Sequence, residues 1–242
     1  MKSFLSIVFI FAAAVGAFAQ AKTSTARKSG STKPPGSHPA AAKIPAVVPI
    51  KKGSIPNGLA GRTYANKDFG FEVTFPVSWL IPGDDFESEM KKAGFDLSLS
   101  PPTSVNAVDR ARMNKALQKI RVLLTAYRSM PGSEDNAIVR ISTEDLGTEP
   151  QIRDAVDYFD AMRSQFASMK LPPDIKYSET GAEQLGKQQF AYIDTTSSEG
   201  KKRLYATVRK RHAILFSISY SKDDDLQALR QVLSEGNFAL AR

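Results

Sequence analysis

The sequence predicts an α+β domain, an α/β/α sandwich in which helices cover both faces of a central antiparallel sheet. Two observations support this prediction. Short segments with alternating apolar residues lie on either side of one strongly amphipathic helical segment at 150–169. The last three strand-like segments are separated only by short turns, which favours antiparallel neighbours. The sequence shows neither a repeated strand–helix–strand order nor a GxGxxG turn, so it does not indicate a doubly wound nucleotide-binding fold.

The first part of the chain differs in composition from the rest. A short basic start, an apolar run and the motif Ala17-Phe18-Ala19 predict a signal peptide over 1–19. Retention of this segment as an uncleaved anchor is the alternative, although the apolar run is short for a membrane span. Residues 20–61 lack aromatic residues and are rich in Pro, Ala, Ser and Lys, so we expect a disordered linker. The folded domain is expected at 62–242.

The excess positive charge of the chain lies in residues 1–61. This arm contains no Asp or Glu, and its basic residues are Lys2, Lys22, Arg27, Lys28, Lys33, Lys43, Lys51 and Lys52. Removing these eight from the 33 Lys and Arg residues leaves 25, which equals the 25 Asp and Glu residues of the chain. The domain itself is therefore neutral, and we expect no nucleic-acid partner. The linker at 20–61 either only keeps the domain soluble or contacts an anionic membrane or cell-wall polymer, an attraction that salt weakens.

The predicted domain opens with a strand and an aromatic anchor. Apolar residues occupy every second position of the strand, namely Phe69, Phe71, Val73 and Phe75. Pro76 ends the strand because proline cannot donate to a central ladder. Trp79 follows and is expected to close the core, with ligand stacking as the alternative. Two short helices and then two strands are expected next, at 84–93, 103–118, 121–128 and 137–143.

The clearest predicted helix spans 150–169. Its apolar residues follow the i, i+3, i+4, i+7 spacing, and Pro172-Pro173 prevents its continuation. Four strands are expected after it, at 175–179, 188–197, 202–209 and 213–221. In the last of these strands one face carries Ile214, Phe216, Ile218 and Tyr220, and the other carries Leu215, Ser217 and Ser219. A final helix at 223–234 has leucines on its apolar side, and Gly236 is placed to end it.

The order of core and turn residues resembles that of PsbP-like proteins. The opening of the domain shares with that family Tyr64, Phe69-Gly70-Phe71, Phe75-Pro76 and Trp79. The later part is similar in its helix at 150–169, its strand around Phe190-Ala191-Tyr192 and its last helix after Ser219-Tyr220-Ser221. The resemblance covers roughly residues 62–240. It implies an α/β/α sandwich and a binding or assembly role rather than an enzymatic one, whereas the bacterial-style signal departs from a chloroplast transit peptide.

Few residues suit catalysis or metal binding. The cysteine count of 0 excludes disulfides and thiolate ligands, and the two histidines, His38 and His212, are too few for common zinc sites. His38 lies in the linker. His212 follows Lys210 and Arg211 in a predicted hairpin turn, where we expect an ordinary turn residue rather than a general base.

The remaining polar motifs have structural explanations. Asp223-Asp224-Asp225 opens the last predicted helix, so capping is favoured over a hard-metal site. Asp154, Asp157 and Asp160 lie on the surface of the helix at 150–169, where solvated charge is the default. The S-x-x-K match at 219–222 ends a strand and lacks its companion motifs. We therefore expect no catalytic residue, no cofactor and no metal.

One polar surface of the sheet is a candidate ligand or partner face, with packing under a helix as the alternative. Its predicted members are Glu72, Thr74, Tyr205, Thr207, Ser217 and Ser219. The sequence thus favours a non-enzymatic, exported binding or assembly module of the cell envelope, periplasmic or extracellular, with a protein or envelope partner. An envelope hydrolase that uses carboxylate and hydroxyl side chains is the alternative function.

Overall fold

The folded domain begins earlier than the sequence predicts. The computed structural model describes residues 58–83, 85–101, 105–133, 136–198 and 200–238. The predicted signal peptide and the linker up to residue 57 lie outside the described residues. Within the predicted linker, however, strand β1 (Gly58–Ala60) pairs antiparallel with β2 (Thr63–Asn66). Gly61, with a φ of 62°, supplies the left-handed backbone that this two-residue hairpin turn requires.

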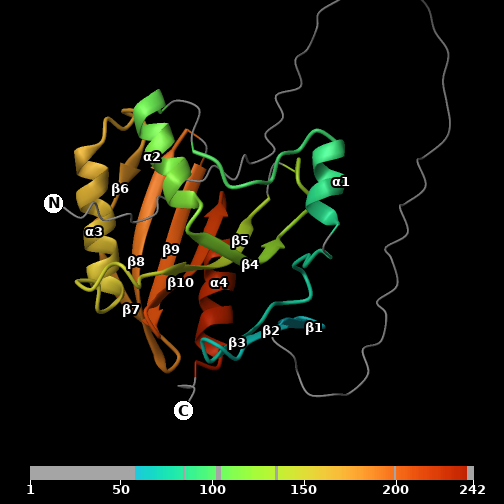
Figure 1. Ribbon diagram of the computed structural model, residues 1–242. Coiled ribbons are helices and arrows are strands. Elements are labelled where there is room, and N and C mark those ends of the chain that lie inside the picture. Colours follow the sequence, from blue (N-terminus) through green and yellow to red (C-terminus); the bar gives the residue numbers. More distant parts are fainter. Residues whose placement is uncertain (1–57, 84, 102–104, 134–135, 199, 239–242) are drawn as a thin grey trace, which may run out of the picture.

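Two antiparallel sheets and four helices make up the described part of the chain (Figure 1). The small sheet has the order β1-β2-β3, where β3 is Phe71–Thr74. The main sheet contains, in spatial order, β4 (Ile120–Tyr127), β5 (Ile138–Asp145), β10 (His212–Tyr220), β9 (Gly200–Arg209), β8 (Gln188–Ser197) and β6 (Lys176–Tyr177), and β7 (Gly181–Leu185) also pairs with β8. The helices are α1 (Phe86–Lys92), α2 (Ala107–Leu117), α3 (Ala155–Ser168) and α4 (Asp223–Glu235).

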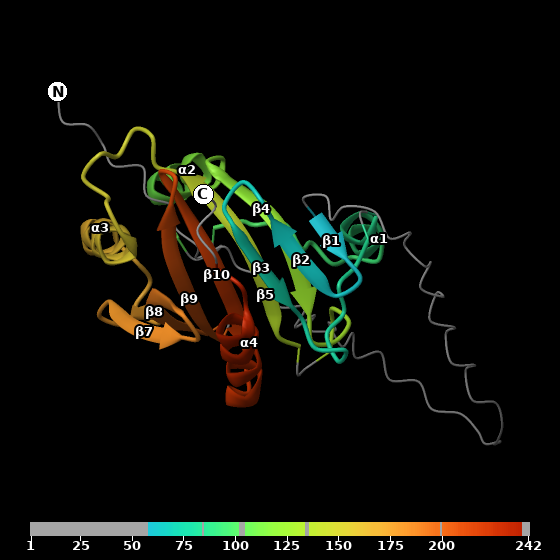
Figure 2. The ribbon, with the colours of Figure 1, turned by 90° about the horizontal axis from the view of Figure 1, so that it is seen from below.

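Both faces of the main sheet are covered, as the predicted α+β class requires. Helices α2 and α3 lie on one face, and α4 with the small sheet lies on the other (Figure 2). The alternation along β10 separates the two cores, because Leu215 packs with Phe159 and Met162 of α3, whereas Phe216 packs with Phe71 and Leu229. The predicted two faces of this strand are therefore confirmed.

An aromatic cluster joins the small sheet to the main sheet. Phe71 of β3 meets Phe216 of β10 edge-on, with ring centroids 5.5 Å apart and planes at 75°. Phe238, from the segment after α4, stacks on Phe71 at 6.1 Å and meets Phe190 of β8 at 5.2 Å. Trp79 is 3% exposed in the same core, so its predicted structural role is confirmed. Such pairs stabilise by about 0.5–1.5 kcal/mol each beyond the area that they bury.

Arginine side chains tie the small sheet and the C-terminal segment to the main sheet. The guanidinium group of Arg209 donates to the carbonyl oxygens of Gly70 at 3.0 Å and Phe238 at 2.6 Å, and to Gln188 Oε1 at 2.7 Å. Arg62 donates to the carbonyl oxygens of three residues that follow β3, Phe75, Pro76 and Trp79. Backbone carbonyls outside a ladder need donors, and these two side chains supply them.

Several element boundaries differ from the prediction. Helix α3 starts at Ala155 instead of residue 150, because the Asp154 carboxylate accepts hydrogen bonds from Val156 N and Asp157 N, both at 2.9 Å, and caps the helix there. The strand predicted around 69–75 is the third strand of the separate small sheet. The β8-β9-β10 meander is confirmed. The turn between β9 and β10 has positive φ at Lys210 (47°) and Arg211 (62°).

Two buried tyrosines differ in the partner of their hydroxyl group. Tyr158 Oη donates to Glu144 Oε2 at 2.8 Å, and both residues are at most 1% exposed. The hydroxyl group of Tyr127 is buried without a hydrogen-bond partner among the described residues. Burial raises the pKa of Tyr127 to about 12, so this hydroxyl stays neutral at physiological pH.

Replacing each tyrosine by phenylalanine should separate these two cases. Tyr158→Phe is expected to lower the free energy of unfolding by about 1–3 kcal/mol, because the buried Glu144 carboxyl group loses a donor. Tyr127→Phe is expected to leave that free energy unchanged or to raise it by up to about 1 kcal/mol, since no bond among the described residues is lost. Urea unfolding followed by Trp79 fluorescence measures both variants. An equal loss in the two would contradict the assignment.

Candidate functional site

The structure does not bring the six predicted face residues together. In the main sheet, Tyr205 and Thr207 share the side of Phe216, whereas Ser217 and Ser219 point to the opposite side. This split follows from the cross-strand register, in which Tyr205 lies opposite Phe216 and therefore shares its face. The prediction of one common polar face was therefore wrong, because it combined residues whose side chains point to opposite sides of the sheet. Ligand binding by any one of these residues stays a prediction.

Glu72 and Thr74 belong to β3 of the small sheet and not to the main sheet. The backbone of Glu72 pairs with that of Asn237, and Thr74 Oγ1 lies 2.8 Å from Thr63 Oγ1 on exposed surface. The hydroxyl group of Tyr205 is already used, because it donates to Glu183 Oε2 at 2.8 Å. Burial raises the pKa of Tyr205 to about 12, which keeps this hydroxyl neutral.

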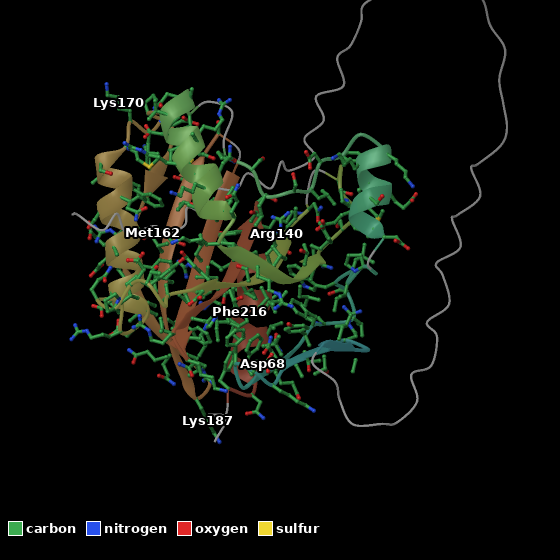
Figure 3. All side chains as sticks on the ribbon, viewed as in Figure 1. Asp68, Arg140, Met162, Lys170, Lys187 and Phe216 are labelled. Atoms are coloured by element: carbon green, nitrogen blue, oxygen red, sulfur yellow. The ribbon has the colours of Figure 1, made fainter. Side chains whose placement is uncertain are left out.

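A pocket of about 470 Å³ lies beneath the turn between β2 and β3, and we call it the turn pocket. Its size lies within the range of small-molecule sites, about 300–1,000 Å³. It lies on the same face of the main sheet as Phe216, and Figure 3 shows Asp68 of this turn on the Phe216 side of the domain, away from Met162 in the other core. Most of its lining is polar: Tyr64, Asn66, Asp68, Lys119, Arg121, Thr143, Asp145 and His212.

The floor of the turn pocket consists of neighbouring residues on three strands. Arg121 of β4 lies opposite Thr143 of β5, and Asp145 of β5 lies opposite His212 of β10. Thr143 and Asp145 are two positions apart on β5, so their side chains share one face. Cross-strand neighbours of this kind have Cβ atoms about 4.5–5.5 Å apart. Lys119, just before β4, completes the polar floor.

The roof of the turn pocket is the braced turn between β2 and β3. The Asn66 side-chain oxygen accepts a hydrogen bond from Phe69 N at 3.0 Å, and its amide group donates to Tyr64 Oη at 3.3 Å. Gly70 has a φ of 65°, a conformation that glycine adopts without strain. This turn brings the Phe69 ring to 5.0 Å from the His212 imidazole, which fixes the distance between roof and floor.

Charges of both signs line the turn pocket. Lys119 and Arg121 are cationic, and Asp68 and Asp145 are anionic. Asp145 Oδ1 also accepts a hydrogen bond from Gly147 N at 2.7 Å, which leaves its second oxygen available. Burial raises the pKa of the Tyr64 hydroxyl, and the Asn66 hydrogen bond and the Arg121 charge only partly oppose this effect.

The prediction that His212 is an ordinary turn residue missed its place in the turn pocket. It is the first residue of β10 and is half-buried, and its Nδ1 lies 2.9 Å from the carbonyl oxygen of Lys210. In the described part of the chain no hydrogen bond joins His212 to Thr143 or Asp145, so a nucleophile–base pair is not formed there. The sequence did contain one indication of this position. His212 is two and four residues before Ile214 and Phe216, so in a strand its side chain lies on the same face as theirs.

The other acidic motifs take structural roles. Asp225 is buried in the first turn of α4, and its Oδ1 lies 3.4 Å from Arg128 Nε. Asp160 accepts a hydrogen bond from Thr180 Oγ1 at 2.6 Å. Over the described ranges, no group of three or more His, Asp or Glu side chains is arranged to hold a metal ion. Of the helices in those ranges, none combines the length and the hydrophobicity that a membrane span needs.

Comparisons with solved structures find similar folds at low sequence identity. A cyanobacterial PsbP of Synechocystis sp. PCC 6803 is 15% identical, and the match covers 77% of this chain and 98% of that chain with a TM-score of 0.38. LpqN, involved in cell envelope biogenesis of Mycobacterium tuberculosis, is 10% identical, and the match covers 74% and 86% with a TM-score of 0.35. A Bacteroides thetaiotaomicron protein is also 10% identical, with coverages of 75% and 48% and a TM-score of 0.29.

These comparisons concern the arrangement of the backbone. Neither a family model nor a curated protein matches the sequence. A cyanobacterial PsbP, from the family whose residue order this sequence resembles, is among the matched structures. The α+β fold class itself follows from the strands and helices described above.

Proposed function

We propose that the chain is an exported binding module of the cell envelope whose ligand occupies the turn pocket. The observation that carries this proposal is the composition of that pocket. It gathers both signs of charge and neutral hydrogen-bonding groups around a volume of about 470 Å³. Concave sites with a few convergent polar groups are the usual form of small-molecule sites. Export is supported by the apolar run and the Ala17-Phe18-Ala19 motif of the predicted signal peptide.

Binding is favoured over hydrolysis for a geometric reason. A hydrolase with carboxylate and hydroxyl groups needs a base within hydrogen-bond reach of its nucleophile. In the described structure of the turn pocket, no side-chain hydrogen bond joins Thr143 to His212 or to Asp145. The hydrolase alternative has no comparable observation in its favour.

Filling the turn pocket should abolish ligand retention. Val122 lines the pocket and is 40% exposed, so Val122→Trp adds an indole at the pocket wall without replacing a core residue. Val156 on α3 is 42% exposed and lies outside the pocket, which makes Val156→Trp a matched control. The mature protein is dialysed against a small-molecule extract of the envelope, and the retained compounds are identified by mass spectrometry.

The expected result is one retained compound for the wild type and Val156→Trp, and a decrease of about tenfold or more for Val122→Trp, equivalent to about 1.4 kcal/mol of binding free energy. Equal retention by the two tryptophan variants would refute the turn pocket as the binding site. No retained compound with any of the three proteins would count against a small-molecule ligand altogether.

Residues 20–57, which we call the basic arm, are proposed to hold the module against an anionic membrane or cell-wall polymer. The support is its charge, since residues 20–57 contain only basic ionisable groups apart from His38. Each Lys or Arg near an anionic membrane contributes about 1 kcal/mol at most, and salt screens this attraction.

A charge-neutral arm should release the protein from envelopes. The variant replaces by Gln the basic residues of the arm, which are Lys22, Arg27, Lys28, Lys33, Lys43, Lys51 and Lys52. The wild type is expected to sediment with isolated envelopes at low salt and to leave them as salt is added, whereas the variant stays in the supernatant at every salt concentration. Salt-independent sedimentation of both proteins would show that the charge of the arm does not hold the module.

A further inference from the structure

We propose that the turn pocket binds a small zwitterion, an amino acid or a short peptide, with its carboxylate at Arg121 and its ammonium group at Asp68 and Asp145. The inference rests on the proposed function, which makes this pocket the ligand site. It adds the chemical class of the ligand and the side chains that recognise each end of it.

Arg121 differs from every other arginine that the structure describes. The other eleven donate to backbone carbonyls, as Arg209 does, or pair with carboxylates, as Arg230 does with Glu183. The side chain of Arg121 makes no hydrogen bond or ion pair with any described residue, and Arg121 lines the turn pocket. A guanidinium group presents two parallel N–H donors that match a carboxylate. Arg121 is an exposed residue whose guanidinium group is therefore available to a carboxylate from outside the described structure.

Lys119 adds a second cation to the lining of the turn pocket. It is half-buried at the start of β4, and its ammonium group likewise has no ion pair with a described residue. The neutral hydroxyl group of Tyr64 lies within the electrostatic influence of Arg121 and supplies a further hydrogen-bond donor. Lys119, Arg121 and the Tyr64 hydroxyl group are thus three lining groups that favour an anionic oxygen.

The two carboxylates restrict the ligand to one that carries both charges. Asp68 belongs to the roof and Asp145 to the floor, so an ammonium group between them has a partner on each side. A phosphate or another purely anionic ligand meets repulsion from these two residues, and a polyamine meets repulsion from Arg121 and Lys119. A zwitterion complements both sets of side chains, because it carries one charge of each sign.

The remaining wall of the turn pocket is apolar. It is formed by Phe69, Val122 and Leu123. An aliphatic side chain of the bound amino acid or peptide has a hydrophobic surface to contact there, and burial of its methylene groups favours binding. A volume of about 470 Å³ has room for a dipeptide.

Calorimetric titration of the full-length mature protein tests the assignment. The probes are L-leucine and L-alanyl-L-leucine, together with the N-acetylated and the C-amidated dipeptide. At least one of the two free probes is expected to bind, and blocking either terminus of the dipeptide should weaken its binding tenfold or more. Arg121→Gln should weaken binding of the free dipeptide by a similar factor but leave the amide unchanged, since the amide has no carboxylate to lose. Arg153→Gln, on exposed surface of the α3 side, is the matched control and should bind like the wild type.

The outcomes separate this inference from the proposed function. Equal affinity for the free dipeptide and its amide, or no binding of either free probe up to about 10 mM, overturns the zwitterion assignment. Binding of inorganic phosphate, spermidine or maltose instead, lost in Val122→Trp, overturns it too but supports the turn pocket as a ligand site. Binding of the dipeptide that Val122→Trp does not affect refutes the pocket and therefore both proposals.

Discussion

The packing of the small sheet against the main sheet is the constraint on which the rest of the structure depends. Phe71 of β3 contacts Phe216 at 5.5 Å and Phe238 at 6.1 Å, so one ring connects the small sheet, the main sheet and the segment after α4. The turn pocket exists only because of this packing. Its floor lies on three strands of the main sheet, and its roof is the turn at 67–70 of the small sheet. A shift of the small sheet by one residue would exchange the inward and outward side chains of β3 and remove the roof.

Arginine residues hold in place the segments that the two sheets do not order by themselves. Arg209 donates hydrogen bonds to backbone carbonyl oxygens before β3 and after α4, and Arg62 donates to carbonyl oxygens that follow β3. Carbonyl groups outside a ladder need such donors when water is excluded. Against this pattern, Arg121 is informative, because the same chemical group faces the turn pocket with no described partner. The contrast between guanidinium groups that are used and one that is open is the basis for assigning a carboxylate ligand.

Local periodicity was sufficient to predict the longer elements but not the candidate site. The β8-β9-β10 meander and α3 carry clear apolar patterns over nine residues or more, and the structure confirms them. Strands β1, β2 and β7 have five residues or fewer and were not predicted. Strand β3 is equally short but was predicted, because the alternation of apolar residues extends beyond it to Phe69 and Phe75. The turn pocket joins residues 58–69, 119–145 and 212, and their proximity follows from tertiary packing rather than from any spacing along the chain. For this reason His212 was identified only as a turn residue, and Arg121 was not singled out.

The interaction between Phe71 and Phe216 is tested most directly by a double-mutant cycle. Phe71→Leu, Phe216→Leu and the double variant are unfolded in urea, and the coupling energy is obtained from the four free energies of unfolding. If the two rings hold the sheets together, the coupling should be about 0.5–1.5 kcal/mol in favour of the native pair. A coupling within about 0.3 kcal/mol of zero, the usual result for independent sites, would contradict the account of how the small sheet is held and the turn pocket is formed.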